Sequence, residues 1–235
     1  MTQKLIAALD TADLATAQAW ARALTPHCGA LKLGLEFFLA HGPAGIAAIQ
    51  GLPIFLDLKL HDIPNTVAGA VRSILPLAPA MLTLHASGGG AMIAAARNVV
   101  ERASVRPKLL AVTVLTSLDE AALREMGIDH SPAQLVLTLA RSALSHGADG
   151  LVCSAHEVAM LRAEFGAAPI LVVPGIRPAG SDVADQARTM TPSAAVRAGA
   201  DHIVVGRPIT QSPDLGAAAA AIAAEVRNAF SPLNA

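Results

Sequence analysis

The sequence is poor in cysteine and in charged residues, and each shortage excludes a class of protein. Its two cysteines, Cys28 and Cys153, lie far apart and match neither a disulfide framework nor a metal-binding spacing. Only 15% of the 235 residues are charged and the formal net charge is −1, so the composition carries no electrostatic footprint for nucleic acid or for an anionic membrane. We therefore expect a cytoplasmic protein with reduced thiols.

Long apolar segments are also missing. The densest one, Leu215–Ala224, consists mostly of alanine and has about half the length that a bilayer requires. Near the N-terminus, the apolar run Leu5–Leu9 stops at Asp10 and is too short for a secretory signal. The sequence thus predicts a soluble chain with no membrane-spanning segment and no signal peptide.

Apolar residues are nevertheless abundant, at 53% of the chain. They form short runs that are apolar at nearly every position, which is typical of parallel strands covered on both faces. These runs are Leu5–Leu9, Leu31–Leu35, Pro53–Leu60, Met81–His85, Leu109–Thr116, Gly150–Ser154, Ile170–Pro174 and His202–Val205. Alanine-rich segments of helical composition lie between them, at Asp13–Leu24, Thr66–Leu75, Gly90–Ala103, Gln134–His146 and Ser193–Ala198.

Eight strand–helix units in a chain of this length predict an α/β fold, a closed (β/α)8 or TIM barrel that forms a single domain over residues 1–235. An open, doubly wound sheet is the alternative. That architecture favours a glycine-rich turn after the first strand, and Asp10–Asp13 contains no glycine. The similar steps Gly147–Asp149 and Gly199–Asp201 are typical of a helix C-terminus that leads into the next strand.

Charged side chains interrupt two of the predicted strands. Lys32 lies in the second, and Asp57 and Lys59 lie in the third. Because side chains alternate between the two faces of a strand, Asp57 and Lys59 share a face with Phe55, opposite the leucines. The leucine face must pack on helices, so the charges are predicted to face the mouth of the barrel, where TIM barrels hold their active sites. By the same argument Lys32 faces inward, and Asp10 ends the first strand.

The number of these charges favours function over structure. A single buried Asp–Lys pair would suit the core of a barrel as well as an active site. Two lysines with Asp10, Asp57 and Asp62 exceed what a core requires, because buried charges are costly. Two carboxylates near Lys59 would favour its ammonium form, which argues for a cation that stabilises a carbanion and returns a proton to it.

Glycine and arginine follow the last two predicted strands. Arg177 lies in one loop, and Gly206 and Arg207 lie in the other. Many barrels bind a phosphate at these loops through backbone N–H groups, and an arginine adds a charged fork. Ordinary solvated arginines beside turn glycines are the alternative. Residues 175–190 lack apolar periodicity and are predicted to be a closing lid, with Gln186 within reach of the ligand.

The histidines offer no clear metal site. His61 and His85 could join Asp57 as ligands, but no set of three or four residues with a usual spacing emerges. Histidines that form hydrogen bonds beside a site are the alternative interpretation. Since no flavin or nicotinamide fingerprint is present either, the sequence predicts neither a metal nor a cofactor.

The segment Ile54–Thr66, which contains the string Asp-x-Lys-x-x-Asp-Ile-Pro-x-Thr, resembles the signature of the orotidine 5′-monophosphate decarboxylase family. Other segments agree in their order: Ala8–Asp10, Leu31–Gly34, Val114–Thr116, Pro174–Arg177, Asp185–Gln186, Met190–Pro192 and Val205–Arg207. The resemblance covers essentially the whole chain. It implies a TIM barrel that converts orotidine 5′-monophosphate to uridine 5′-monophosphate and carbon dioxide, without a cofactor, in pyrimidine synthesis.

The resemblance also implies roles for the matching residues. Lys59 would donate a proton to carbon 6 of the pyrimidine, and Lys32, Asp57 and Asp62 would complete a charged tetrad. The residues implied to bind the substrate are Asp10, Lys32, Asp57, Lys59, Asp62, Ile63, Thr66, Thr116, Pro174, Arg177, Gln186, Gly206 and Arg207. A homodimer would bring Asp62 and Thr66 to the neighbouring subunit's site. One departure is Val173, at a position where threonine is expected next to the base.

Three other functions fit parts of the pattern. A related, metal-dependent sugar-phosphate decarboxylase would need a carboxylate shell; Glu36 is available, but Lys32 and Lys59 would crowd a cation. A Schiff-base aldolase would use Lys59 as its nucleophile. A barrel that binds a phosphate ligand without turnover is the non-enzymatic alternative, but it has no need of Lys59, Asp57 and Asp62 together.

Overall fold

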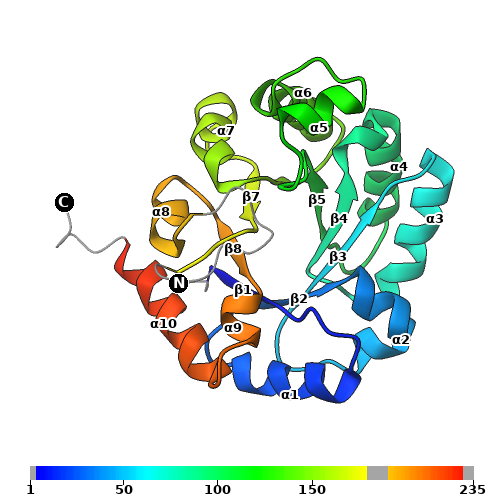
Figure 1. The fold of residues 1–235 in the computed structure, drawn as a ribbon. Coiled ribbons are helices and arrows are strands. Elements are labelled where there is room, and N and C mark those ends of the chain that lie inside the picture. The colour runs from blue at the N-terminus through cyan, green and yellow to red at the C-terminus, as the bar shows by residue number, and fades with distance from the viewer. Residues whose placement is uncertain (1–3, 179–189, 230–235) are drawn as a thin grey trace.

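In the computed structural model, eight parallel strands close into a barrel in chain order, with helices around the outside (Figure 1). The structure describes residues 4–178 and 190–229. The strands are β1 (Leu5–Ala8), β2 (Ala30–Gly34), β3 (Ile54–Leu60), β4 (Met81–His85), β5 (Lys108–Val112), β6 (Gly150–Val152), β7 (Ile170–Val173) and β8 (His202–Val205). The predicted TIM barrel is confirmed.

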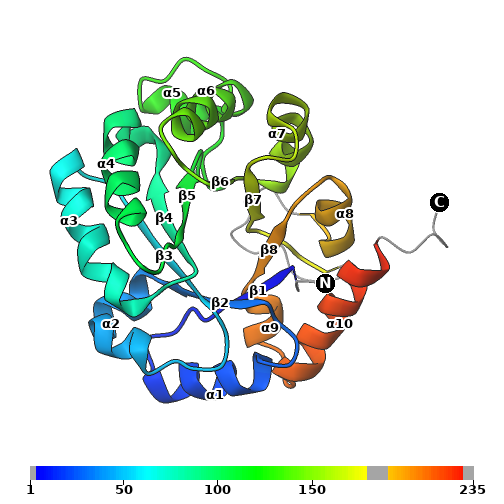
Figure 2. The ribbon, with the colours of Figure 1, turned by 180° about the vertical axis from the view of Figure 1, so that it is seen from behind.

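The helices follow the strands around the ring. They are α1 (Leu14–Leu24), α2 (Leu35–Ala47), α3 (Pro64–Ile74), α4 (Gly90–Glu101), α5 (Glu120–Glu125), α6 (Pro132–Ser145), α7 (Val158–Phe165), α8 (Pro192–Arg197), α9 (Arg207–Thr210) and α10 (Leu215–Asn228). Short 3-10 turns lie at η1 (Leu75–Leu77), η2 (Ala86–Gly88) and η3 (Ala155–Glu157). In the reverse view α10 lies beside α1, so the last helix completes the ring next to the first (Figure 2).

Polar side chains fix where several helices begin. The Asp13 carboxylate accepts a hydrogen bond from the Thr16 N–H at 2.7 Å, ahead of α1. Asp214 does the same for the Ala217 N–H at 2.9 Å, ahead of α10. Such N-caps each stabilise a helix by about 1 kcal/mol. In the part of the chain that the structure describes, no helix is both long and apolar enough to cross a bilayer.

Two apolar layers separate the inside of the barrel from its outside. The inner layer fills the barrel and consists of Ile6, Ala8, Ala30, Phe55, Met81, Leu110, Val172 and Val204. The outer layer packs between strands and helices and includes Leu56 and Leu58. The predicted alternation along the third strand is therefore seen, with Phe55 inside and its leucine neighbours outside.

The pairing of β3 with β4 is irregular just where β3 carries its charges. Leu56 pairs with Leu82 and Leu60 pairs with Leu84, so three residues of β3 lie opposite the single residue Thr83. Within this bulge Lys59 has φ +49°, in the left-handed region that few residues other than glycine adopt. A bulge of this kind bends the strand and changes the direction of its side chains.

Candidate active site

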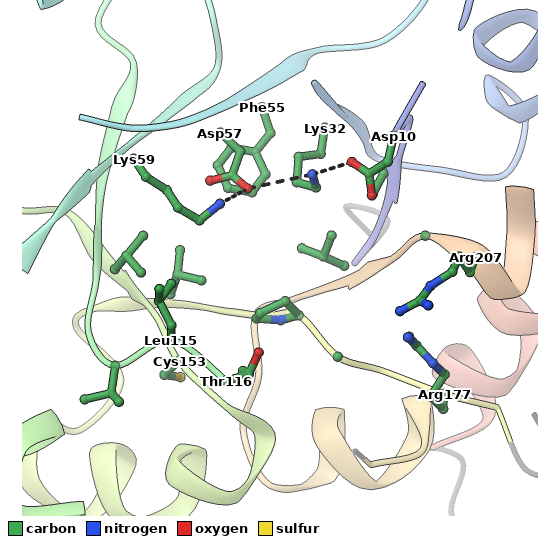
Figure 3. A pocket seen from close by; sticks show the side chains of 18 residues that line it. Asp10, Lys32, Phe55, Asp57, Lys59, Leu115, Thr116, Cys153, Arg177 and Arg207 are labelled. Atoms are coloured by element: carbon green, nitrogen blue, oxygen red, sulfur yellow. Dashed lines mark hydrogen bonds and ion pairs between the residues drawn. The ribbon is translucent and has the colours of Figure 1, made fainter. Parts of the chain in front are cut away.

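A cavity of about 260 Å³ opens at the C-terminal ends of the strands (Figure 3). Its lining is charged along one wall, apolar at its base and cationic at one end. The lining residues are Ala8, Asp10, Lys32, Phe55, Asp57, Lys59, Val112, Val114, Leu115, Thr116, Val152, Cys153, Pro174, Gly175, Arg177, Val204, Gly206 and Arg207. The structure thus brings together most of the residues that the sequence nominates.

The charged wall is a continuous row of alternating ions (Figure 3). Lys59 Nζ lies 2.7 Å from Asp57 Oδ2. Lys32 Nζ lies 3.7 Å from the same oxygen and 3.0 Å from Asp10 Oδ1. These residues come from β2 and β3 and from the end of β1, which are neighbours in the barrel, so their side chains meet at one level.

Asp57 is the buried centre of this row, with 12% of its side chain exposed. Burial by itself would raise its pKa. The positive charges of Lys32 and Lys59 and the hydrogen bonds from Lys59 and Thr83 outweigh burial and hold the pKa of Asp57 below its ordinary value. The carboxylate is therefore ionised at neutral pH.

The two lysines differ in their access to the cavity. Lys32 lies between two carboxylates and exposes 13% of its side chain, whereas Lys59 exposes 31% and pairs with Asp57 alone among the described residues. An ammonium with one carboxylate partner retains more capacity to attract an anion that enters the cavity. Lys59 is therefore the better placed cation for chemistry.

Two guanidinium groups face each other at the far end of the cavity, those of Arg177 and Arg207 (Figure 3). Burial lowers the pKa of Arg177, and the nearby charge of Arg207 lowers it further. Like charges held this close favour an anion between them. Gly175 also lines this end with φ +75°, a conformation that favours glycine. This end can bind a phosphate.

Asp62, Ile63 and Thr66 lie outside the cavity. All three are exposed at the start of α3, and Ile63 retains 67% of its surface. The Asp62 carboxylate accepts the Ile63 N–H at 2.6 Å, and no ion pair within the described part of the chain joins it to Lys59. Two carboxylates were expected near Lys59. Among the described residues of this chain only Asp57 forms an ion pair with it, because the backbone turns outward into α3 after β3.

Gln186 and most of the predicted lid lie outside the described residues. Of that segment, residues 175–178 and 190 are described. Ile176 forms an isolated bridge with Met190, and the Arg177 N–H donates to the Met190 carbonyl at 3.0 Å. These contacts hold the two ends of the segment together, next to the arginine end of the cavity.

The two candidate histidine ligands lie side by side without forming a metal site. The rings of His61 and His85 are 5.3 Å apart. Burial lowers the pKa of His85, and the charges of His61 and Lys59 add to the effect. Across residues 4–178 and 190–229, no group of three or more histidine, cysteine or acidic side chains is arranged to hold a metal ion.

One polar residue at this site was missed by the sequence analysis. Thr83 is fully buried in β4, and its hydroxyl donates to Asp57 Oδ1 at 2.9 Å. The signal in the sequence was weak, a single threonine inside the apolar run 81–84. Its partners became visible only through the irregular pairing of β3 with β4.

One family model and several relatives match nearly the full length of this chain. The model of the orotidine 5′-phosphate decarboxylase / HUMPS family matches residues 3–222. The chain is 54% identical to the orotidine 5′-phosphate decarboxylase of Gluconobacter oxydans (strain 621H), over 96% of this chain and 98% of that protein. It is 56% identical to the enzyme of the same name from Anaeromyxobacter sp. (strain K), over 95% and 98% of the two chains.

Solved structures agree with the sequence comparison. The crystal structure of orotidine 5′-phosphate decarboxylase from Lactobacillus acidophilus is similar with a TM-score of 0.84 and 40% identity, over 95% of this chain and 99% of that chain. The protein of the same name from Pyrococcus horikoshii OT3 has a TM-score of 0.77 at 23% identity, a likeness that shows the fold alone.

Proposed function

Because the chain belongs to the orotidine 5′-phosphate decarboxylase / HUMPS family, we propose that it converts orotidine 5′-monophosphate to uridine 5′-monophosphate and carbon dioxide in pyrimidine biosynthesis. The observation that carries the proposal is one cavity with a Lys–Asp row on its wall and two arginines at its end. We place the activity in the cytoplasm, with a nucleotide as substrate and with no metal, cofactor, membrane or nucleic acid involved.

Lys59 is the proton donor in this proposal. When the C–C bond breaks, its electron pair stays on carbon 6 in the plane of the ring, where the π-system cannot delocalise it. An ammonium beside that carbon stabilises the developing charge and then transfers its proton to it, while carbon dioxide leaves. Each additional ~1.4 kcal/mol of stabilisation in the transition state accelerates the reaction tenfold.

The neighbouring charges hold Lys59 ready for this step. Asp57 accepts a hydrogen bond from the Lys59 ammonium at 2.7 Å and holds that group at the wall of the cavity. Lys32 links Asp57 to Asp10, and we assign Lys32 and Asp10 to the ribose hydroxyl groups. Thr116 and Pro174, across the cavity, are assigned to the pyrimidine ring.

The arginine end is assigned to the phosphate. Arg177 and Arg207 supply charge, Gly206 allows close approach of the backbone, and Gln186 is assigned to the same group on the strength of the family resemblance. The phosphate lies far from the reacting carbon in this arrangement. Its binding energy can therefore be used to order the site around the substrate, which raises the rate as well as the affinity.

A homodimer with shared sites is part of the proposal. Asp62, Ile63 and Thr66 are exposed, so they are free to reach a second subunit. A smaller cavity of about 200 Å³ borders the same charged row and is lined by Leu35 and Glu36 as well. Leu35 retains 48% of its surface and Ile63 67%, an apolar exposure that an interface would cover.

A spectrophotometric assay tests the reaction directly. Purified protein is mixed with orotidine 5′-monophosphate, with and without a chelator, and the loss of orotate absorbance is followed. Turnover that the chelator does not change is expected. Chelator-sensitive turnover of a sugar phosphate would instead favour the metal-dependent alternative. Borohydride trapping of a substrate adduct on Lys59 would favour the aldolase, and nucleotide binding without absorbance change would favour a binding barrel.

Mixed dimers test the sharing of sites. Asp62→Ala and Lys59→Ala proteins are each expected to be inactive. In a random mixture half of the dimers are mixed, and each mixed dimer has one intact site of two, so about a quarter of the sites should regain activity. If dimers verified as mixed stay inactive, Asp62 does not act across the interface.

A further inference from the structure

The buried hydroxyl group of Thr83 forms hydrogen bonds with two of the proposed catalytic residues. Thr83 Oγ1 donates to Asp57 Oδ1 at 2.9 Å and accepts the Lys59 N–H at 2.9 Å. The residue is fully buried in β4 and does not line the cavity. It therefore has no direct contact with a ligand there, and any effect on the reaction must pass through Asp57 and Lys59.

The irregular pairing explains why a side chain is needed at this point. Between the paired residues Leu56 and Leu60, β3 bulges away from regular pairing with β4. Lys59 also has φ +49°, a conformation that persists only when the surrounding structure holds it. The Thr83 hydroxyl takes the place of a backbone acceptor for the Lys59 N–H, which would otherwise be an unsatisfied donor.

The same hydroxyl limits the rotation of the carboxylate. Asp57 Oδ2 receives Lys59 Nζ at 2.7 Å, while Oδ1 receives Thr83. A carboxylate held at both oxygens cannot turn about its own axis without losing a bond. A hydroxyl has one donor and two acceptor positions, so Thr83 can serve both partners at once.

We propose that Thr83 is a positioning residue for the decarboxylation: its hydroxyl fixes the Asp57 carboxylate and the Lys59 backbone together, so that the Lys59 ammonium is aimed into the cavity. This inference rests on the proposed function for its kinetic consequence. Threonine suits the task because its methyl group packs like that of valine among the apolar neighbours, while its hydroxyl makes both bonds. Serine keeps the bonds, and valine keeps only the shape.

The test compares Thr83→Val with Thr83→Ser and with a matched control, Thr113→Val. Thr113 is also buried, but its hydroxyl donates to the backbone carbonyl of Val152 at 3.1 Å, away from the charged row. Thr83→Val is expected to lower kcat by about 10- to 100-fold, because small misplacements of reacting groups are costly. Affinity for uridine 5′-monophosphate should change by less than about threefold, since its phosphate and ribose contacts are elsewhere.

The controls separate positioning from stability. Thr113→Val should lose comparable thermal stability and keep kcat within about twofold of wild type, and Thr83→Ser should keep it within about threefold. The acid limb of the kcat/KM profile should move to higher pH in Thr83→Val, because a hydrogen bond that helps to hold the pKa of Asp57 low is lost. A merely structural residue would not move that limb.

Amide hydrogen exchange gives a second measurement that does not depend on turnover. The Lys59 N–H should be protected in wild type and in Thr83→Ser, and it should lose protection in Thr83→Val. Wild-type kcat in folded Thr83→Val, or equal losses of kcat in Thr83→Val and Thr113→Val, would overturn the inference. If Thr83→Val does not fold, Thr83→Cys, whose thiol is a weak donor, takes its place. A wild-type protein without decarboxylase activity would instead refute the proposed function, and the exchange data would still decide whether Thr83 holds Lys59.

Discussion

Aspartates form ion pairs at both ends of this barrel, but their main partners are arginines at one end and lysines at the other. At the N-terminal end of the strands, Arg97 donates to Asp149 Oδ2 at 2.5 Å and to the Gly147 carbonyl at 2.7 Å. The same Asp149 oxygen accepts the Leu109 N–H at 2.8 Å. One carboxylate thus connects a helix, a strand and a turn.

The arrangement recurs one quarter of the way around the ring. Arg162 donates to Asp201 Oδ2 at 2.5 Å and to the Gly199 carbonyl at 3.0 Å, and the Leu171 N–H donates to that carboxylate at 2.8 Å. Both glycines have a positive φ, +114° at Gly199 and +99° at Gly147. A side chain on either glycine would come within 2.9 Å of its arginine. We call these two groups the Arg97 and Arg162 clamps. Both are held by contacts within the chain, and neither lines the cavity.

The C-terminal mouth is built differently, because its charged side chains line a cavity. There Asp57 is shared between Lys32 and Lys59, and Arg177 faces Arg207. At the N-terminal end each carboxylate accepts a fixed backbone N–H and one arm of an arginine, whereas at the mouth the Asp57 carboxylate pairs with two lysines that also line a cavity. The number of ion pairs is therefore a poor guide to function; whether the charged groups line a cavity that a ligand can enter is a better one.

Removing Lys59 is the largest expected effect at the mouth. Lys59→Ala should lower decarboxylation by more than about 10⁴-fold, because it removes both the proton and the positive charge at the reacting carbon. The free energy of unfolding should change by at most about 1 kcal/mol, because Lys32 and Thr83 still hold Asp57. Single-turnover assays and urea unfolding measure the two quantities. Near-wild-type turnover would reject Lys59 as the proton donor.

Removing Arg97 should give the opposite result. Arg97→Ala removes two bonds, to the partly buried Asp149 carboxylate and to the Gly147 carbonyl. Asp149 keeps the Leu109 N–H and Lys108 at 3.6 Å, so the free energy of unfolding should fall by about 2 kcal/mol. The kcat should stay within about twofold, since the clamp is at the far end of the barrel. Arg124→Ala, which removes an exposed pair with Glu120, is the control and should cost less than about 0.5 kcal/mol. A large loss of kcat in folded Arg97→Ala would contradict the division between the two ends.

Low pH should reduce the stability of the folded protein through one histidine at each end of the barrel. Burial lowers the pKa of His85 near the mouth, and it also lowers the pKa of His202 at the N-terminal end, where Asp201 opposes the shift only in part. The unfolded chain then binds protons first, so the stability these groups contribute is present above their ordinary value of 6.5 and is lost as pH falls below it.

Thermal unfolding between pH 8 and pH 5 measures this loss. The melting temperature of His202→Gln and of His85→Gln should fall less steeply with acid than that of wild type, by about 2–4 °C over the range. The exposed His130 provides the control, and His130→Gln should follow the wild-type slope. A steeper fall in either test variant would contradict the lowered pKa.

The sequence predicted the barrel because its strands are buried on both faces and read as apolar runs. It predicted less well where those runs meet the mouth. The expected strand 109–116 ends at Val112, because Val114 and Leu115 are apolar for the cavity that they line rather than for a sheet. The alanine-rich pattern also did not predict α2. This element consists of two helical segments that meet at Gly42, whose φ of +58° is not helical, and Pro43 follows directly.

The site, too, could be predicted only as far as regular strand geometry extends. Alternation along a strand placed Asp57 and Lys59 on the inward face, and strand order placed Lys32 beside them. Alternation has no means of predicting a bulge or a residue with φ +49°, so Thr83 and the outward turn before Asp62 were invisible to it. The charge pattern had counted Asp62 among the carboxylates near Lys59, whereas in this chain Asp62 and Thr66 are exposed outside the cavity. Their assignment to the neighbouring subunit's site came from the family resemblance alone.

The cysteines offer the smallest and most discriminating comparison between the ends. Cys28 precedes β2 at the N-terminal end, and Cys153 lines the cavity; both are buried. Burial raises the pKa of Cys28 to about 12, and burial with the nearby Glu157 carboxylate raises that of Cys153 well above its ordinary value. Both thiols should therefore react with a disulfide reagent at pH 8 at least ~100-fold more slowly than a free thiol. Cys153→Ala should keep kcat within about twofold. If Cys153 alone reacts quickly and uridine 5′-monophosphate protects it, the mouth opens in solution farther than this structure shows, while the N-terminal end stays closed.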